Sequence, residues 1–359
     1  MPAVSEVVWY SGGPYHKEIQ GPVMGDRIRA GIVGFTGYSG AELVKILERH
    51  RQVEPVLLEH RTRTEDEASF LDGHLRRLPW GDEALRDGGL AVVFFATPHE
   101  VSLELVPKAL DAGLKVIDLS AAFRLRTVGN YQRWYNLEHN RPDLLAEAVY
   151  GLPEYFRNVT KVARLVSNPG CYPTAANLSL RPLVIEGVLD REAGVICDAK
   201  SGVSGAGKKL SPRTHFSAVT QNFSAYAVLM HRHVPELLLT SDVEEHELSF
   251  TAQLLPVHRG ILETIYVRTA ESMSYDEITA IYRKVYNDEP FVRIFPEGEL
   301  PDLQTVNYTN FCDIGIKADP KTKRVVIVAA IDNLVKGAAG QAVQNMNLVL
   351  GLPETEALL

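Results

Sequence analysis

The chain has 359 residues, of which 45% are hydrophobic and 23% charged, and its formal net charge at pH 7 is −8. This is the composition of a globular protein long enough for two domains. The negative charge disfavours nucleic acid as the main partner, because no global basic surface is present to neutralise phosphates. A local basic pocket for a small anion remains compatible with it.

Segments that would place the chain in a membrane or in an oxidising compartment are not evident. No apolar run reaches the roughly 18 residues that span a bilayer, and no basic stretch followed by an apolar block marks a signal peptide. The cysteines are Cys171, Cys197 and Cys312, an odd number at long spacings, without a CxxC pair. The sequence therefore predicts neither a disulfide framework nor a membrane partner, and it favours a reducing, cytoplasmic location.

Residues 1–26 are predicted to be an N-terminal extension, since glycine and proline interrupt them and no period is sustained. From 27 to 170, short apolar runs alternate with amphipathic segments. The predicted strands are 28–33, 53–58, 91–96, 115–119 and 163–167, and the predicted helices are 41–50 and 101–112. This alternation indicates an α/β fold with a doubly wound, parallel, Rossmann-type sheet.

Residues 171–333 have longer, more alternating runs, which are typical of an α+β domain with a mixed or antiparallel sheet. Its predicted strands are 194–200, 247–255, 262–269 and 324–331, and its predicted helices are 174–186 and 275–287. The C-terminal segment 334–359 contains a predicted helix, 337–350, with small residues early in it. We expect this segment to complete the first domain.

A glycine loop, GFTGYSG at 34–40, lies between the first predicted strand and the first predicted helix. In this context a G-x-x-G-x-x-G loop is typical of dinucleotide binding, because its glycines permit a sharp turn, close approach of a pyrophosphate and tight helix packing. An ordinary glycine turn is the alternative. The predicted cofactor-binding residues of the loop are Gly34, Thr36, Gly37, Tyr38, Ser39 and Gly40.

The end of the second predicted strand bears on the type of dinucleotide. Glu59 would favour NAD by binding a ribose hydroxyl, whereas Arg61 and Arg63 would favour NADP by pairing with a 2′-phosphate. The two arginines lead us to predict NADP (NADPH). Surface charges on a solvated loop are the alternative interpretation.

Cys171 lies in the stretch SNPGCYPT at 167–174, between a predicted strand and a predicted helix. Pro173 suits a first helical turn, so Cys171 is expected at a helix N-terminus, where the helix dipole lowers a thiol pKa. Cys197 and Cys312 lie in apolar runs and are expected to be buried structural residues. A thiolate beside a nicotinamide site indicates attack on an activated acyl carbon, a thioester, and reduction to an aldehyde.

The pair His231 and His233, in HRHVPE, supplies a candidate general base. A His-x-His pair is also compatible with a metal ion, but no further cluster at metal-ligand spacing accompanies it, and no metal is predicted. His233 precedes Val-Pro-Glu, which resembles a helix entry.

The glycine-rich loop at 200–208, KSGVSGAGK, is a candidate cradle for phosphate or carboxylate, or else a flexible turn. Arg124, after the strand at 115–119, is a candidate for holding a substrate carboxylate.

These motifs, in this order, resemble the N-acetyl-γ-glutamyl-phosphate reductase family of the aspartate-semialdehyde dehydrogenase superfamily. The resemblance covers about 27–355 and depends most on SNPGCYPT and HRHVPE. It implies reduction of N-acetyl-L-glutamyl 5-phosphate to N-acetyl-L-glutamate 5-semialdehyde and phosphate with NADPH, in arginine biosynthesis, by a homodimer or homotetramer.

Carried onto matching positions, the resemblance makes Cys171 the nucleophile and His233 the acid/base. Which of the two histidines moves the proton is left open by the sequence. The predicted substrate-binding residues are His231, Arg124, Asn168, Lys200, Ser201, Ser204 and Gly205.

Three other functions compete with this interpretation. A carrier-protein-linked aminoadipyl-phosphate reductase of lysine biosynthesis shares the fold and chemistry, but its branch lacks the Tyr-Pro pair after the cysteine and the proline after the histidines. Aspartate-semialdehyde dehydrogenase is disfavoured by HRHVPE. A non-catalytic NADP-binding redox sensor would keep the glycine loop but would have no need of a second domain with paired histidines.

Overall fold

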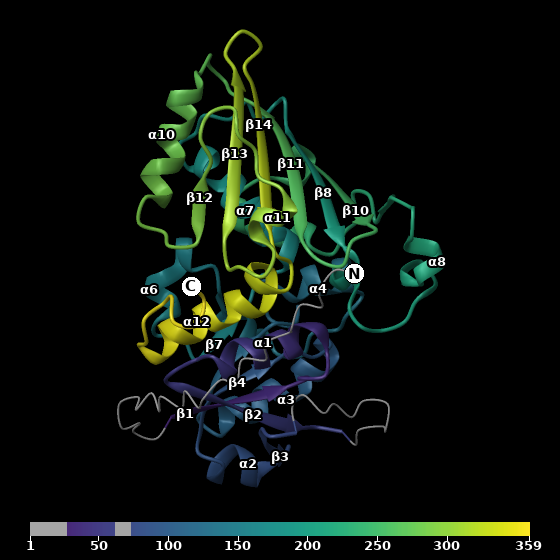
Figure 1. Ribbon diagram of the computed structural model, residues 1–359, viewed down its shortest axis with the longest axis vertical. Coiled ribbons are helices and arrows are strands. Elements are labelled where there is room, and N and C mark those ends of the chain that lie inside the picture. The colour runs from purple at the N-terminus through teal and green to yellow at the C-terminus, as the bar shows by residue number, and fades with distance from the viewer. Residues whose placement is uncertain (1–26, 62–72) are drawn as a thin grey trace, which may run out of the picture.

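A computed structural model describes residues 27–61 and 73–359, so the predicted extension 1–26 and Arg63 lie outside the described residues. The described part of the chain forms two seven-stranded sheets, which follow one another along the long axis of the molecule (Figure 1). The first sheet has the order β3-β2-β1-β4-β5-β7-β6, and every pairing in it is parallel. Its strands are β1 (Ile28–Val33), β2 (Val53–Glu59), β3 (Arg76–Pro79), β4 (Leu90–Phe95), β5 (Lys115–Asp118), β6 (Val149–Tyr150) and β7 (Leu165–Ser167).

The central strands of this sheet are short apolar runs because helices cover both of their faces, so residues pointing either way are buried. The helices of this half are α1 (Tyr38–Glu48), α2 (Asp82–Asp87), α3 (His99–Asp111), α4 (Val128–Tyr135), α5 (Pro142–Glu147) and α6 (Pro153–Thr160). The strand order reverses direction between β1 and β4. In open α/β sheets this switch point is where ligands bind, beyond the carboxyl ends of the strands.

The second sheet is mixed, with the order β12-β13-β14-β11-β8-β10-β9. Strand β8 pairs parallel with β10 and antiparallel with β11. The strands are β8 (Val195–Gly202), β9 (Ser224–Tyr226), β10 (Leu248–Leu255), β11 (Ile261–Arg268), β12 (Val292–Ile294), β13 (Cys312–Asp319) and β14 (Arg324–Ile331). The two sheets confirm the predicted fold class.

Helix α7 (Cys171–Ile185) joins the two halves and packs against β11 and β14, with most of its side chains buried. Cys171 is therefore the first residue of a helix whose body is fixed in the second core. The other helices of this half are α8 (Phe216–Val219), α9 (Val234–Ser241), α10 (Tyr275–Tyr286), α11 (Leu303–Val306) and the single turns η3 (Val203–Ala206), η4 (Pro212–Thr214) and η5 (Glu245–Glu247).

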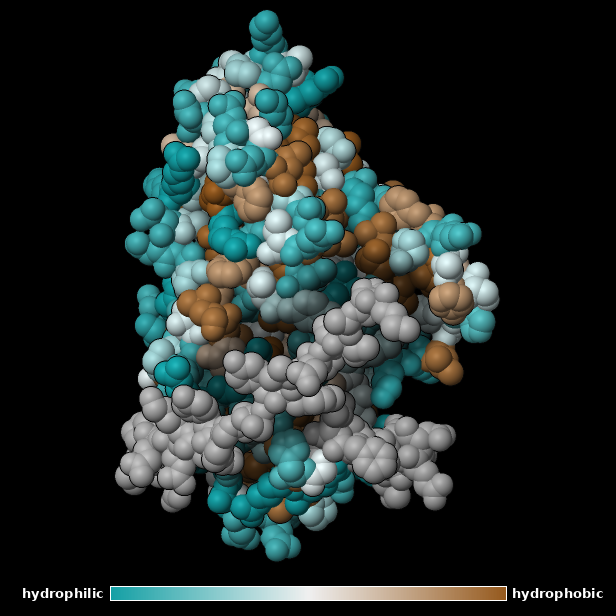
Figure 2. All heavy atoms as spheres, in the orientation of Figure 1, coloured by the Kyte–Doolittle hydropathy of each residue, from teal (hydrophilic) through white to brown (hydrophobic). Residues whose placement is uncertain are grey.

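Residues 207–230 leave the second sheet as an arm that carries α8 and extends sideways, and they return to the sheet through β9 (Figure 1). Hydrophobic surface is visible on this side of the molecule (Figure 2). The exposed large apolar side chains of the arm are Leu210, Phe216, Phe223, Val228, Leu229 and Met230. An apolar surface of this kind is typical of a protein contact.

The last two helical elements are a π-helical turn, η6 (Val335–Ala339), and the helix that follows it, α12 (Gly340–Leu350). The single helix predicted over 337–350 is thus preceded by a wider turn. Helix α12 packs on α1, α6 and β5 and contributes to the first core. Among the described residues no helix is both long and apolar enough to cross a membrane.

Candidate active site

The glycine loop turns between β1 and α1 with two glycines held by close contacts. Gly34 has φ +84°, and a Cβ there would lie 2.4 Å from the Ala96 carbonyl oxygen. A Cβ at Gly40 would lie 2.3 Å from the Gly34 carbonyl oxygen. Gly37 is different, because its nearest neighbour would be 3.5 Å away. Gly34 and Gly40 therefore allow the turn to form, and Gly37 leaves its outer side free for a ligand.

A pocket of about 1250 Å³ lies over this loop and is called the cofactor pocket below. It takes residues from the glycine loop, from the end of β2, from the segment after β4 and from the loop after β8. Five of the six loop residues predicted to bind cofactor line it, together with Arg61, whereas Gly40 packs beneath the loop. The N–H groups of the first turn of α1 would face an anion bound at this position.

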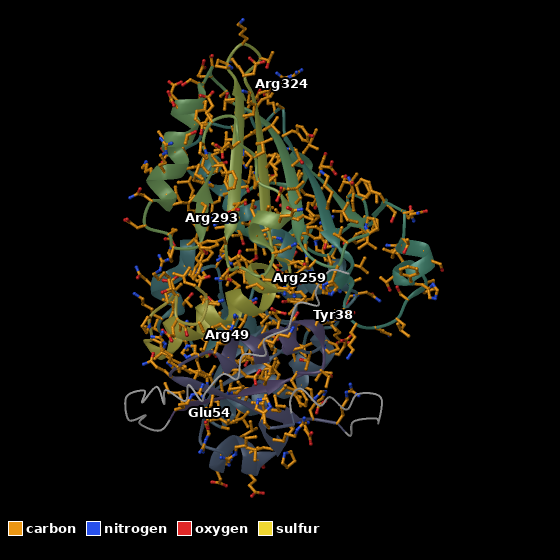
Figure 3. The ribbon with its side chains drawn as sticks, in the orientation of Figure 1. Tyr38, Arg49, Glu54, Arg259, Arg293 and Arg324 are labelled. Carbon is orange, nitrogen blue, oxygen red and sulfur yellow. The ribbon has the colours of Figure 1, made fainter. Side chains whose placement is uncertain are left out.

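Positive charge reaches the cofactor pocket from the second half as well. Lys208 and Lys209 line it, and Lys208 Nζ donates a hydrogen bond of 3.3 Å to the Thr36 carbonyl oxygen. The glycine loop, a helix N-terminus and these cations fit a phosphate-bearing dinucleotide. Tyr38 lies on the side of the first half that faces the second (Figure 3).

Cys171 is only partly exposed and follows Gly170, which is the N-cap of α7. Burial raises the pKa of the Cys171 thiol to about 11, against the opposing effects of the Tyr172 N–H and of Arg124. The sequence predicted a lowered pKa from the helix dipole. In the folded protein the loss of water around the sulfur outweighs that dipole.

The turn before Cys171 is held by Glu236, a fully buried carboxylate on α9. It accepts hydrogen bonds from the Gly170 N–H at 2.9 Å, from Tyr150 Oη at 3.0 Å and from Arg124 Nη1 at 3.0 Å. Arg124 and Glu236 therefore form a buried, hydrogen-bonded ion pair. Loss of either residue would leave the other as an unpaired buried charge. Glu236 thus ties α9 to the nucleophile turn.

Arg124 and Asn168 are directed into the protein. Arg124 Nε donates to the Asn168 carbonyl oxygen and Nη2 donates to the Leu119 carbonyl oxygen, each at 2.8 Å. The amide of Asn168 donates to the Ala338 carbonyl oxygen at 3.1 Å and accepts from Asn345 Nδ2 at 3.1 Å. Both residues line the cofactor pocket, but these bonds occupy every side-chain nitrogen of Arg124.

The two histidines lie side by side, with ring centroids 4.8 Å apart. His231 Nδ1 accepts a hydrogen bond of 3.1 Å from the His233 N–H, and α9 begins directly after His233, as the helix-entry motif predicted. Burial lowers the pKa of His231 to about 4 and lowers the pKa of His233 well below its ordinary value. Both rings are therefore neutral at pH 7, the form that accepts a proton.

His233 also lies against the nucleophile turn, since a Cβ on Gly170 would be 2.8 Å from His233 Nε2. Its Nδ1 has no hydrogen-bond partner among the described residues. His231 is surrounded by aromatic rings instead, with those of Tyr172 and Tyr226 centred 5.4 and 5.5 Å away. Of the two histidines, His233 is the one in contact with the turn that carries Cys171.

A second pocket, of about 670 Å³, opens from Cys171 on the side of the second sheet and is called the acyl pocket below. Among the predicted substrate-binding residues His231, Ser201 and Gly205 line it. Ser204 lines the cofactor pocket and accepts a hydrogen bond of 2.9 Å from Asn333 Nδ2. The two pockets meet: Cys171, Gly205, Ala206, Arg232 and His233 line both.

Comparisons with known proteins agree with this division. The model described as "Semialdehyde dehydrogenase, NAD binding domain" matches residues 29–163, and that described as "Semialdehyde dehydrogenase, dimerisation domain" matches residues 171–333. The chain is 48% identical over 340 residues to the N-acetyl-gamma-glutamyl-phosphate reductase of Symbiobacterium thermophilum, covering 92% of this chain and 97% of the relative. It is 45% identical over 341 residues to that of Desulforamulus reducens, covering 92% and 98%.

The chain belongs to the semialdehyde dehydrogenase family. Within it, the chain falls among the N-acetyl-gamma-glutamyl-phosphate reductases, which confirms the resemblance found in its motifs. Its fold is also that of aspartate semialdehyde dehydrogenase II from Vibrio cholerae, with a TM-score of 0.66 at 16% identity over 91% of this chain and 99% of that one. The aspartate semialdehyde dehydrogenase of Candida albicans, solved with NADP, gives a TM-score of 0.65 over 90% and 99%.

One predicted substrate-binding residue of this reductase family member lies away from both pockets. Lys200 Nζ donates to Asp198 Oδ2 at 2.8 Å and to Thr264 Oγ1 at 3.3 Å, on the opposite face of the second sheet. Successive residues of a strand point to opposite faces, so Ser201 reaches the acyl pocket and Lys200 does not. Cys197 and Cys312 are buried, as predicted.

Two further residues of the site carry no mark of function in the sequence. Glu236 stands in the HRHVPE motif but was expected only to help begin a helix. Gly337, in η6, approaches the nucleophile so closely that a Cβ there would lie 2.9 Å from Cys171 Cβ. The small residues at the start of the predicted C-terminal helix were the only sequence signal for Gly337. They predicted close packing on another element, but they did not show that this element carries Cys171. Among the described residues, no group of three or more His, Cys, Asp or Glu is arranged to hold a metal ion.

Proposed function

We propose that this chain is an NADPH-dependent reductase that converts N-acetyl-L-glutamyl 5-phosphate to N-acetyl-L-glutamate 5-semialdehyde and phosphate in arginine biosynthesis. The observation that carries the proposal is the position of Cys171 and His233 where the cofactor pocket meets the acyl pocket. A reaction between a bound acyl group and a bound dinucleotide requires such a junction. The identity to reductases of this name over nearly the whole chain supports the substrate.

In the first step His233 takes the proton of the Cys171 thiol, and the thiolate attacks the acyl carbon. The carbon–oxygen bond to phosphate breaks, phosphate leaves and a thioester to Cys171 remains. The N–H groups at the start of α7 stabilise the negative charge on sulfur and on the carbonyl oxygen. Thiolate and imidazolium form together as an ion pair, so proton transfer costs less than the separate pKa values suggest.

When bound, NADPH supplies the hydride that reduces the acyl group. The glycine loop would hold its pyrophosphate, with Gly37 facing it and the N-terminus of α1 beneath it. Arg61, which lines the cofactor pocket, and Arg63 support a preference for the 2′-phosphate of NADP over NAD. His233, as imidazolium, returns its proton to the oxygen of the reduced carbon, and that proton is lost again when the aldehyde leaves Cys171.

We further propose that the protein is a cytoplasmic homodimer or homotetramer. The match of residues 171–333 to a dimerisation domain and the exposed apolar side chains of the arm support assembly. Three free thiols are consistent with a reducing compartment.

The proposal is tested in the reverse direction, by absorbance at 340 nm. The purified protein receives N-acetylglutamate semialdehyde, phosphate, and NADP or NAD. We expect phosphate-dependent reduction of NADP that exceeds reduction of NAD. A response to an aminoadipate semialdehyde or to aspartate semialdehyde instead would keep the chemistry and refute the substrate. No response to any aldehyde, with NADP still bound, would favour a redox sensor.

A further inference from the structure

The acyl pocket carries net positive charge in a chain whose net charge is −8. Its described lining includes two arginines, Arg213 and Arg232, and no aspartate or glutamate. Burial keeps its two histidines neutral by lowering their pKa values. Neither arginine forms an ion pair with a carboxylate among the described residues, whereas Arg124 and Arg259 do. The pocket is therefore prepared for an anion that the protein itself does not provide.

The substrate named above has two negatively charged groups at opposite ends of its carbon chain, the acyl phosphate and the α-carboxylate. Arg124 is the arginine that the sequence predicted to bind the carboxylate. Its three side-chain nitrogens donate hydrogen bonds to Leu119, Asn168 and Glu236. Its side chain is 7% exposed. Three of the five N–H donors of Arg124 are thus used within the protein, and an arginine that faces the acyl pocket is the better candidate for the carboxylate.

The two arginines of the acyl pocket differ in whether they also line the cofactor pocket. Arg232 lines both pockets, beside Cys171 and His233, and so lies at the reacting end. Arg213, in η4, lines the acyl pocket alone. Because the acyl carbon must reach Cys171, where the pockets meet, the rest of the acyl chain extends into the acyl pocket, which Arg213 lines.

Arg213 is positioned by an aromatic ring. Its guanidinium carbon lies 5.5 Å from the centroid of the Tyr226 ring, and Tyr226 Oη lies 3.2 Å from Tyr172 Oη. Stacking of a guanidinium on a ring leaves its N–H edge available for a carboxylate. Ser211 and Thr214, close to Arg213 in the chain, also line the acyl pocket and offer hydroxyl donors.

We infer that Arg213 binds the α-carboxylate of the substrate and is the residue by which the enzyme selects acyl chains that carry this group. This rests on the proposed function. Bidentate pairing of a guanidinium with a carboxylate gives both affinity and geometric selection, and a lysine would supply the charge without the second hydrogen bond.

The test compares two aldehydes in the reverse reaction: N-acetylglutamate semialdehyde, and 4-acetamidobutanal, which lacks only the carboxylate. Arg213→Gln is expected to lower kcat/KM for the first about 30- to 100-fold, mainly through KM, and to change that for the second by less than about twofold. Arg213→Lys should recover part of the loss. Arg324→Gln, an exposed arginine at the far end of the molecule (Figure 3), is the matched control and should leave both values unchanged.

An equal loss of kcat/KM on both aldehydes in Arg213→Gln would overturn the inference, since it would show a general effect on the site. The inference would also be overturned by a carboxylate-selective loss in Arg232→Gln with none in Arg213→Gln. In both cases an active wild-type protein keeps the proposed function standing. A wild-type protein inactive on both aldehydes would refute the proposed function and, with it, this inference.

Discussion

The two pockets that meet at Cys171 differ in whether backbone or side-chain groups form them. The cofactor pocket depends on backbone, because Gly34 and Gly40 leave no room for a Cβ and the anion site consists of N–H groups. The acyl pocket depends on side chains held by other side chains, as with Arg213 over the Tyr226 ring and Tyr226 Oη at 3.2 Å from Tyr172 Oη. Substitutions in the first should act through shape and lower cofactor affinity. Substitutions in the second should act through protons and charge, and should lower turnover or substrate affinity.

The largest effect is expected at the junction itself. Cys171→Ala removes the nucleophile and should lower kcat by at least ~10⁴-fold while the dissociation constant for NADPH stays within about twofold. Single-turnover reduction and NADPH fluorescence titration measure the two quantities. Cys197→Ala, at a buried cysteine in the same half, is the control for thiol loss. Near-normal turnover in Cys171→Ala would refute covalent catalysis.

The next effect concerns the proton. His233→Asn should lower kcat by about 10²- to 10⁴-fold, because His233 contacts the nucleophile turn, whereas His231→Asn should act mainly on KM. Steady-state kinetics of both variants decide the assignment. A larger loss of kcat in His231→Asn would reverse the roles given to the two histidines.

The same histidines predict a pH dependence of stability. Their pKa values are lowered in the folded protein, so below about pH 6.5 the unfolded chain binds more protons than the folded one. The stability is complete above the unfolded pKa and falls as the pH decreases, by about 1.4 kcal/mol per pH unit for each histidine. Denaturant unfolding between pH 7 and pH 4.5 should show this slope, and His231→Asn should reduce it. An unchanged slope would contradict burial as its cause.

A graded effect is expected in the cofactor pocket. Gly40→Ala should weaken NADPH binding by about tenfold or more, because the added Cβ must displace the Gly34 carbonyl and with it the loop. Gly129→Ala, where an added Cβ has no neighbour within 4 Å, is the control. Fluorescence titration of NADPH provides the readout. If Gly40→Ala lowered kcat and left NADPH affinity unchanged, the contrast between the two pockets would be wrong.

The smallest effect is expected at Lys200. Since its ammonium group binds Asp198 and Thr264 away from both pockets, Lys200→Gln should change kcat/KM by less than about threefold. Steady-state kinetics at saturating NADPH are sufficient. A loss comparable with that of Arg213→Gln would restore the substrate role that the sequence gave to Lys200.

Sequence periodicity predicted most accurately the helices and strands that are buried on both faces, or on one face at a regular spacing. Strands β1 and β2 and helix α7 follow the predicted ranges because their apolar runs reflect their own burial. Strand β13 went unpredicted because it contains the buried Asp313, which accepts hydrogen bonds from Arg293 on β12. A charge in a central strand breaks the apolar pattern, and its compensating partner is recognisable only after folding.

Local sequence determined the chemistry of this protein: a glycine turn before a helix, a cysteine at a helix start and a histidine at a helix entry each depend on a few adjacent residues. The tertiary structure decided which of these groups meet. The Arg124–Glu236 pair joins positions 112 residues apart, and it makes a predicted substrate-binding residue a support of the nucleophile turn as well. It also decided the state of the groups, because burial, which no local pattern measures, keeps Cys171 and the histidines neutral in the folded chain.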